Sequence, residues 1–131
     1  MDYIAIGQEK ENVRIDFLNI EDLINIARKY SNLTFRFIDT EFYPKELISW
    51  RGSYDLPSIT FGDKPIKGFD FEKLLLDGLK KSHTGFKGGE YTYNKWQEPY
   101  IAQRGFSSEY KIKGYEVNGC ELILITDIDE Y

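Results

Sequence analysis

Apolar residues at helical spacing indicate two amphipathic helices. In the first stretch they lie three or four residues apart, at Leu23, Ile26, Ala27 and Tyr30. Asn19 precedes this stripe as an N-cap, Asp22 occupies the third helical position, and Leu18 and Leu23 are placed for a hydrophobic staple. This helix should end near Ser31 and Asn32.

The second helical stretch repeats this arrangement. We expect Asp70 to be its N-cap and Phe69 and Leu74 to form the staple. Its inward face should consist of Phe71, Leu74, Leu75, Gly78 and Leu79. Lys80, Lys81 and His83 follow near its end, where positive charge complements the helix dipole.

Alternating apolar positions indicate strands elsewhere. Val13, Ile15 and Phe17 alternate with polar residues, and residues 3–6 could pair with them. Leu33, Phe35 and Phe37 alternate in the same way, and residues 86–93 alternate loosely.

The C-terminal region has the pattern of a β-hairpin. Residues 110–117 and 120–127 flank Asn118-Gly119, which is typical of a two-residue type I′ turn. Gly114 shifts the alternation and suggests a bulge. Residues 122–125 are all apolar, so this strand should be central or covered. Together the elements predict an α+β fold, an antiparallel β-sheet with two packed α-helices.

Length and composition fit a single globular domain over residues 1–131. The 131 residues are 41% hydrophobic and include 21 aromatic side chains, too many for a disordered chain. No apolar stretch is long enough for a membrane span, no secretory signal is visible, and one cysteine excludes an internal disulfide framework. We therefore expect a cytoplasmic protein without membrane contact.

The charge is unevenly distributed. The net charge is −5, yet residues 80–113 hold seven basic and three acidic side chains, and residues 114–131 hold five acidic and no basic ones. General duplex DNA binding is not expected, because it needs an excess of cations over the whole footprint. The basic stretch is either a local anion-binding patch or a solvated face.

The usual catalytic groups are scarce. The single histidine, His83, is placed to complement a helix end, and the single cysteine, Cys120, is expected to be a packed thiol on one face of a buried hairpin. Asp127, Asp129 and Glu130 lack the spacing of a calcium loop. We expect no metal, no cofactor and no catalytic residue.

Two glycine-bearing segments stand out. In Trp50-Arg51-Gly52-Ser53-Tyr54, the guanidinium lies among aromatic residues, where it could bind phosphate or carboxylate or form a buried ion pair. Within residues 85–92, Lys87 lies beside Gly88 and Gly89. This combination is expected at an anion-binding site, but glycines are equally typical of a β-bulge. Seven aromatic residues between 83 and 110 interleave with Lys87, Lys95 and Arg104, a composition that suits either nucleotide stacking or a protein interface.

These segments, the helix over 71–81 and the later Trp96 resemble a family of small accessory proteins of tailed phages and prophages. The members share an aromatic-Arg-Gly-x-Tyr element and a Phe/Tyr-Lys-Gly-Gly-acidic-aromatic-Thr element, which match residues 50–54 and 86–92. The resemblance covers roughly residues 49–105. It implies a phage accessory gene acting in the host bacterial cytoplasm, and such genes often encode inhibitors of host defence.

The function expected from the sequence is therefore that of a phage-type, non-enzymatic binding protein that counters a host defence system. It would sequester a nucleotide signal or block a host immune protein, and it could form a homo-oligomer. The expected ligand- or partner-binding residues are Arg51, Tyr54, Lys87, Gly88, Gly89, Tyr91, Tyr93 and Trp96. The alternatives are a nucleotide-processing enzyme and a minor virion structural or assembly protein.

Overall fold

A computed structural model describes residues 2–4, 17–50, 53–84, 90–103 and 106–128. Its two helices are α1 (Ile20–Lys29) and α2 (Gly68–Lys80). The strands are β1 (Asp2–Ile4), β2 (Thr34–Phe37), β3 (Tyr43–Trp50), β4 (Ser53–Gly62), β5 (Ile66–Lys67), β6 (His83–Thr84), β7 (Glu90–Tyr91), β8 (Tyr100–Gln103), β9 (Phe106–Asn118) and β10 (Glu121–Ile128). None of the helices in these ranges is long and apolar enough to cross a membrane.

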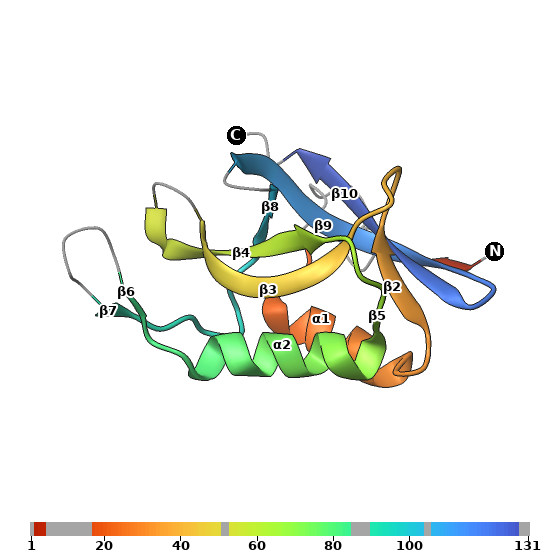
Figure 1. Ribbon diagram of the computed structural model, residues 1–131, viewed down its shortest axis with the longest axis horizontal. Helices are drawn as coiled ribbons and strands as arrows, with labels where there is room; N and C mark the ends of the chain where they lie inside the picture. The colour runs from red at the N-terminus through yellow and green to blue at the C-terminus, as the bar shows by residue number, and fades with distance from the viewer. Residues whose placement is uncertain (1, 5–16, 51–52, 85–89, 104–105, 129–131) are drawn as a thin grey trace, which may run out of the picture.

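The predicted α+β architecture is confirmed, with both helices on one side of the main sheet (Figure 1). The strands of this sheet follow the order β3-β4-β8-β9-β10-β2-β5, and β1 pairs with β9. Most neighbours are antiparallel, but β10 pairs with β2 and β4 pairs with β8 in parallel. The alternation of apolar residues marks a strand but not its direction, so these two parallel pairings were not predicted.

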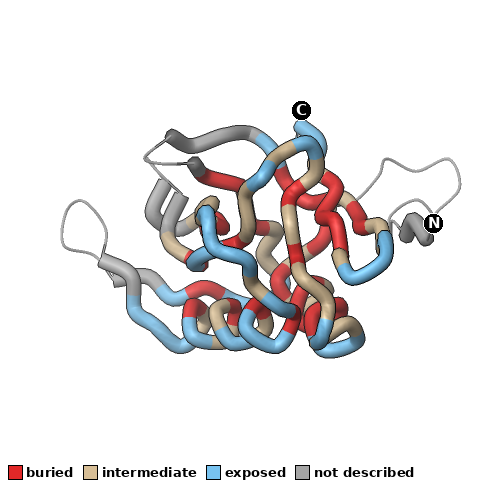
Figure 2. The backbone as a smooth tube through the Cα atoms, turned by 45° about the vertical axis from the view of Figure 1, so that its right-hand side comes forward, coloured by how far each residue is buried: buried red, intermediate tan, exposed pale blue. Residues whose placement is uncertain are grey.

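The main sheet is strongly curled. The rings of Phe37 on β2 and Phe61 on β4 stack with centroids 4.7 Å apart, although three strands separate β2 from β4 in the sheet order. Strand β3 also contacts β2 directly. The helix α2 covers β3, and this approach is so close that a Cβ on Gly78 would lie 2.6 Å from Cβ of Leu47. Figure 2 shows that buried residues lie mainly where the helices face the sheet.

The start of α1 agrees with the sequence prediction. Asn19 is the N-cap: its side-chain oxygen accepts the N–H of Asp22 at 2.8 Å, and a carboxylate oxygen of Asp22 accepts the N–H of Asn19 at 3.0 Å. Leu23, Ile26 and Ala27 are buried in the core below the sheet. The stripe predicted for this helix is therefore its packed face.

The predicted start of α2 is wrong. The helix begins at Gly68 with Lys67 as its N-cap and no side-chain cap, so Asp70 lies inside its first turn. The backbone N–H groups of Gly68 and Phe69 donate instead to the carbonyl oxygens of Leu33 and Ser31, at 3.0 and 3.1 Å. Because the turn that follows α1 satisfies these donors, the helix starts three residues earlier than predicted, without a polar cap. Phe69 is 52% exposed, which excludes the predicted staple.

The predicted C-terminal hairpin is confirmed, but its turn is shifted by one residue. Asn118 pairs with Glu121, so Gly119 and Cys120 form the two-residue loop. Gly119 has a φ of 64°, which suits the first central position of a type II′ turn. Cys120 is consequently exposed and is not the packed thiol that we expected.

The other features predicted for this hairpin are present. The register shifts where Ile125 pairs with Gly114 and Thr126 with Ile112, so the extra residue of the bulge is Lys113, next to Gly114. All four residues 122–125 are buried, and β10 lies between β9 and β2. Strand β1 pairs with β9, whereas residues 5–16, which include most of its predicted partner, lie outside the described residues.

Candidate functional site: an exposed tryptophan on a fixed turn

Trp96 is the most exposed large hydrophobic residue of the described chain, with 62% of its surface accessible. It lies on the turn 94–97, which two side chains hold closed. The Asn94 side-chain oxygen accepts the N–H of Trp96 at 3.0 Å, and the Gln97 side-chain oxygen accepts the N–H of Asn94 at 3.0 Å. The N–H of Gln97 also donates to the carbonyl oxygen of Asn94. These bonds fix the backbone that carries the indole.

The same turn is attached to the start of α1. The N–H groups of Ile20 and Glu21 donate to the carbonyl oxygens of Gln97 and Lys95, each at 2.9 Å. The first turn of a helix has N–H groups without partners inside the helix. Here the turn 94–97 supplies two partners, so the N-terminus of α1 serves as the support of Trp96.

Lys95 lies beside the indole. Its ammonium is 4.9 Å from the centroid of the Trp96 ring and 2.9 Å from a carboxylate oxygen of Glu21. The Lys95 side chain is 52% exposed and that of Glu21 33%. Glu21 was not recognised as part of this site, because it precedes Lys95 by more than 70 residues in the sequence. A cation–π contact and an ion pair thus restrain the two exposed side chains of the turn.

The structure describes the other predicted site residues only in part. Tyr93 is 5% exposed and packs inside the molecule. Tyr54 belongs to β4 and Tyr91 to β7, and nothing is described of their side chains. Arg51, Lys87, Gly88 and Gly89 lie outside the described residues.

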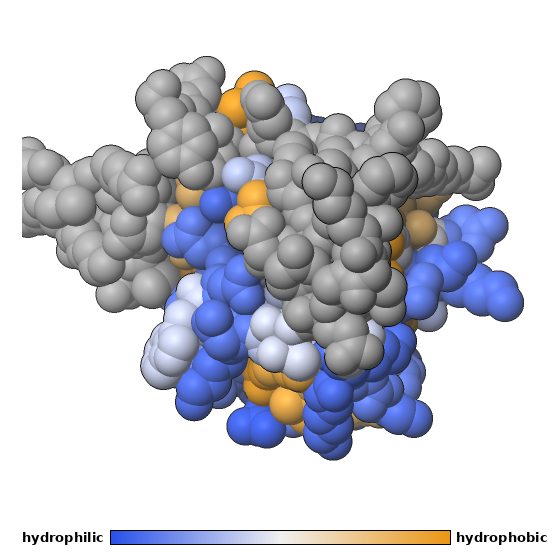
Figure 3. Space-filling view, turned by 90° about the vertical axis from the view of Figure 1, so that its left-hand side faces the viewer, coloured by the Kyte–Doolittle hydropathy of each residue, from blue (hydrophilic) through white to orange (hydrophobic). Residues whose placement is uncertain are grey.

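The flanks of the two glycine-bearing segments lie toward one end of the molecule. Trp50 pairs with Ser53 at the end of the β3–β4 hairpin, and Thr84 pairs with Glu90 in the small sheet of β6 and β7. Figure 1 shows the end of that hairpin, the β6–β7 pair and the C-terminal end of α2 on its left-hand side. Figure 3 views this end directly, and hydrophilic side chains flank a small hydrophobic area on its lower part.

Several lysines of the basic stretch form ion pairs with nearby carboxylates. Lys111 is 7% exposed and donates to Glu98 at 3.2 Å, with its ammonium 4.6 Å from the Tyr100 ring centroid. Lys113 donates to Asp127 at 3.1 Å. The N–H of Ile128 and then the Lys113 ammonium lower the pKa of Asp127. Lys95 pairs with Glu21 as described above, so at least three of the five basic residues that the structure describes in this stretch have acidic partners.

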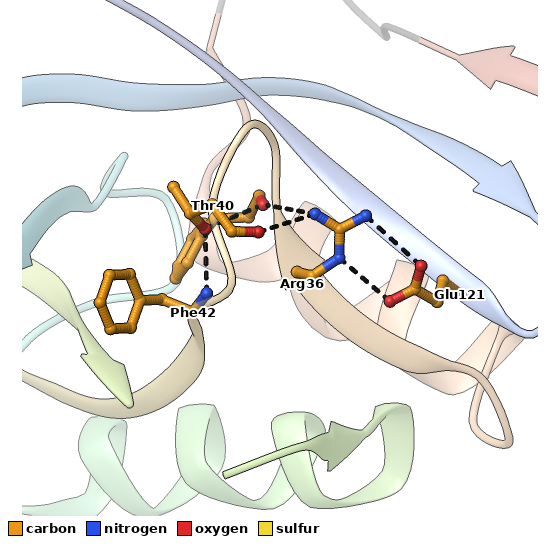
Figure 4. Close-up of polar contacts among 5 residues, drawn as sticks. Arg36, Thr40, Phe42 and Glu121 are labelled. Carbon is orange, nitrogen blue, oxygen red and sulfur yellow. Dashed lines mark hydrogen bonds and ion pairs between the residues drawn. The ribbon is translucent and has the colours of Figure 1, made fainter. Parts of the chain in front are cut away.

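A shallow hollow of ≈ 660 Å³ lies beside the loop after β2, at the far end of the β3–β4 hairpin from Trp50. Arg36 is one of the residues that line this hollow, and its hydrogen bonds connect the loop to β10 (Figure 4). The guanidinium donates to both carboxylate oxygens of Glu121, at 3.0 and 3.4 Å, and to the carbonyl oxygen of Thr40 at 2.8 Å. The hydrogen bond with Glu121 raises the pKa of Arg36. This hollow was not predicted, because strand order decides that β2 and β10 are neighbours.

The guanidinium of Arg36 therefore stabilises the loop rather than presenting itself to a ligand. Asp39, Glu41 and Asp63 add carboxylates to the same hollow. The described residues contain no group of three or more histidine, cysteine, aspartate or glutamate side chains that could hold a metal ion.

Comparison with known proteins adds no further constraint: no family model, no curated protein and no solved structure matches the chain.

Proposed function

We propose that this chain is a non-enzymatic binding protein that blocks a protein partner through Trp96. The resemblance of residues 49–105 to phage accessory proteins supplies the setting, so the proposed partner belongs to a host defence system in the bacterial cytoplasm. The observation that carries the proposal is the exposure of Trp96 on a turn held by side-chain and backbone hydrogen bonds.

An exposed, restrained tryptophan suits an interface for two reasons. Tryptophan is enriched among the few residues that dominate binding free energy, where truncation to alanine commonly costs about 2 to 4 kcal/mol. A side chain whose backbone is already ordered loses less conformational entropy on binding. The bonds to Asn94, Gln97 and α1 provide this order before the partner arrives.

A nucleotide signal is the alternative ligand. The pairing of Thr84 with Glu90 brings together the two ends of the segment that contains Lys87, Gly88 and Gly89. Glycine N–H groups with a nearby lysine can bind phosphate, and an indole can stack on a base. A test of the proposed function must therefore include nucleotides as well as protein partners.

The test begins with capture of partners from a bacterial lysate on immobilised protein, followed by titration of the purified partner. Trp96→Ala should weaken binding about 30-fold or more, which corresponds to the loss of a central aromatic anchor. Phe69→Ala is the matched control, because Phe69 is also aromatic and exposed but lies on the first turn of α2. It should change the affinity less than about threefold.

Other outcomes would favour other functions. Equal affinities of the Trp96→Ala and Phe69→Ala variants would contradict the proposed role of Trp96. A thermal shift with a cyclic nucleotide, lost in Lys87→Ala, would favour sequestration of a nucleotide signal. Turnover of that nucleotide would favour the enzymatic alternative, and recovery of the protein from purified particles would favour a virion component.

A further inference from the structure

We propose that the Trp96 site recognises an acidic segment of its protein partner, in which an apolar side chain covers the indole and a carboxylate binds Lys95. This inference rests on the proposed function and names the chemistry of the partner. It follows from three features of the site: the donor capacity of the Lys95 ammonium, the engagement of the neighbouring carboxylates, and the position of the ammonium over the ring.

The Lys95 ammonium has capacity for another acceptor. An ammonium carries three N–H donors, and within the described part of the chain its ion-pair partner is Glu21, at 2.9 Å. The lysine side chain is the more exposed member of this pair, 52% against 33%. The Lys95 side chain is therefore more accessible to a partner that approaches Trp96 than the Glu21 side chain is.

The acidic residues of the first turn of α1 are already engaged. Glu21 binds Lys95, and a carboxylate oxygen of Asp22 accepts the N–H of Asn19 at 3.0 Å. The positive end of the α1 dipole also lies at this turn. The hydrogen-bond donors that this turn offers to an incoming group are thus those of the Lys95 ammonium.

The position of Lys95 also disfavours a basic partner. The ammonium lies 4.9 Å from the ring centroid and occupies the cation–π position on the indole. A lysine or arginine of a partner that stacked on this ring would lie close to a like charge. An aliphatic or aromatic side chain meets no such repulsion and buries the exposed ring.

An acidic peptide fits this site better than a nucleic acid. Nucleic-acid binding by stacking depends on several cations along the backbone path. Among the described lysines of the basic stretch, Lys111 and Lys113 pair with Glu98 and Asp127, and Lys80 and Lys81 follow one another at the end of α2. The ammonium that lies over the indole is that of Lys95, and it matches one carboxylate beside one apolar side chain.

The test uses the fluorescence of Trp96 in a Trp50→Phe background, where it is the only tryptophan. The probes are short capped peptides with a central phenylalanine flanked by aspartates, lysines or asparagines, and a short oligothymidine. The aspartate peptide should bind about tenfold more tightly than the lysine peptide, the difference expected for one favourable ion pair replaced by repulsion. Lys95→Met should lower its affinity several-fold, and Lys95→Glu should reverse the preference.

Lys29→Met is the matched control. The Lys29 ammonium also lies over an aromatic ring, 5.4 Å from the centroid of Tyr30, but at the opposite end of α1. This variant should bind the aspartate peptide as the Trp50→Phe protein does. Tighter binding of the lysine peptide or of the oligothymidine, or no binding of the aspartate peptide at millimolar concentration, would overturn the inference.

The titration with the captured partner separates this inference from the proposed function. Binding that depends on Trp96 but is unchanged or strengthened by Lys95→Glu would overturn the acidic chemistry alone. Binding that is indifferent to Trp96 would overturn the proposed function as well.

Discussion

Gly68 lies at the first position of α2, where backbone atoms of the C-terminal end of α1 and of Ser31 surround its Cα. A Cβ at this position would be 2.4 Å from the carbonyl oxygen of Tyr30 and 2.7 Å from that of Ala27. Gly68→Ala should therefore lower the free energy of unfolding by about 2 to 3 kcal/mol, because backbone atoms in a packed turn cannot move aside. Urea denaturation monitored by circular dichroism measures this change.

Gly62→Ala is the control for that substitution. A Cβ on Gly62 would approach only side-chain atoms of Lys45, with a nearest distance of 3.1 Å. The nearest of these atoms is Cβ of Lys45, and a shift of a few tenths of an ångström relieves the contact, so the cost should stay below about 1 kcal/mol. Equal midpoints for the two variants would show that the close approach at Gly68 is relieved by movement of the helix.

Tyr115 gives the fold a specific sensitivity to alkali. Burial, and then its hydrogen bond with Tyr30, raise the pKa of the Tyr115 hydroxyl far above its usual range. Because the pKa is higher in the folded state, folding favours the neutral form of Tyr115, and the neutral form adds to the free energy of unfolding. This contribution is complete below about pH 10, where unfolded tyrosine titrates, and it is lost as the pH rises further. Tyr115→Phe should therefore lose less stability than the wild type between about pH 8 and about pH 11.

Urea unfolding at the two pH values checks this prediction. Tyr110→Phe is the comparison, since Tyr110 is 44% exposed and its variant should follow the wild-type loss. A Tyr115→Phe protein that loses as much stability as the wild type would place the alkaline sensitivity elsewhere.

At the scale of elements, the two helices begin in different ways, and their caps should respond differently to substitution. Asn19→Ala removes the side chain that accepts the N–H of Asp22, so it should cost about 1 kcal/mol. Asp70→Ala should cost about 0.5 kcal/mol or less, because carbonyl oxygens of Ser31 and Leu33 already satisfy the first N–H groups of α2. Paired urea titrations would contradict this difference if both variants lost the same free energy.

The same contrast explains which elements the sequence could predict. The cap of α1 involves residues within four positions of one another, so the local pattern of Asn19 and Asp22 was sufficient to predict it. The start of α2 depends on a turn more than 30 residues earlier, which no local pattern reveals. The hairpin turn moved by one residue because Gly119 takes the first central position, so that Asn118 ends β9 instead of entering the loop.

At the scale of the whole molecule, composition and periodicity were sufficient for the α+β class and for a covered β10. They were insufficient for the parallel pairs and for the curl that brings Phe37 onto Phe61, because these depend on contacts between segments distant in sequence. For the site, aromatic density drew attention to Trp96, but its partner Glu21 required the fold. Arg51 and Lys87 lie outside the described residues, so their expected role in binding stays a prediction.

The place of β10 in the sheet has a consequence for how the protein is made. This strand is the last one described, yet it lies between β9 and β2, and Glu121 pairs with Thr34, far earlier in the chain. During synthesis both helices and most strands leave the ribosome before the strand that joins β2 to the rest of the sheet. Until then, the apolar faces that meet Leu122 and Leu124 lack their cover, so we expect the nascent chain to be prone to aggregation before β10 is in place.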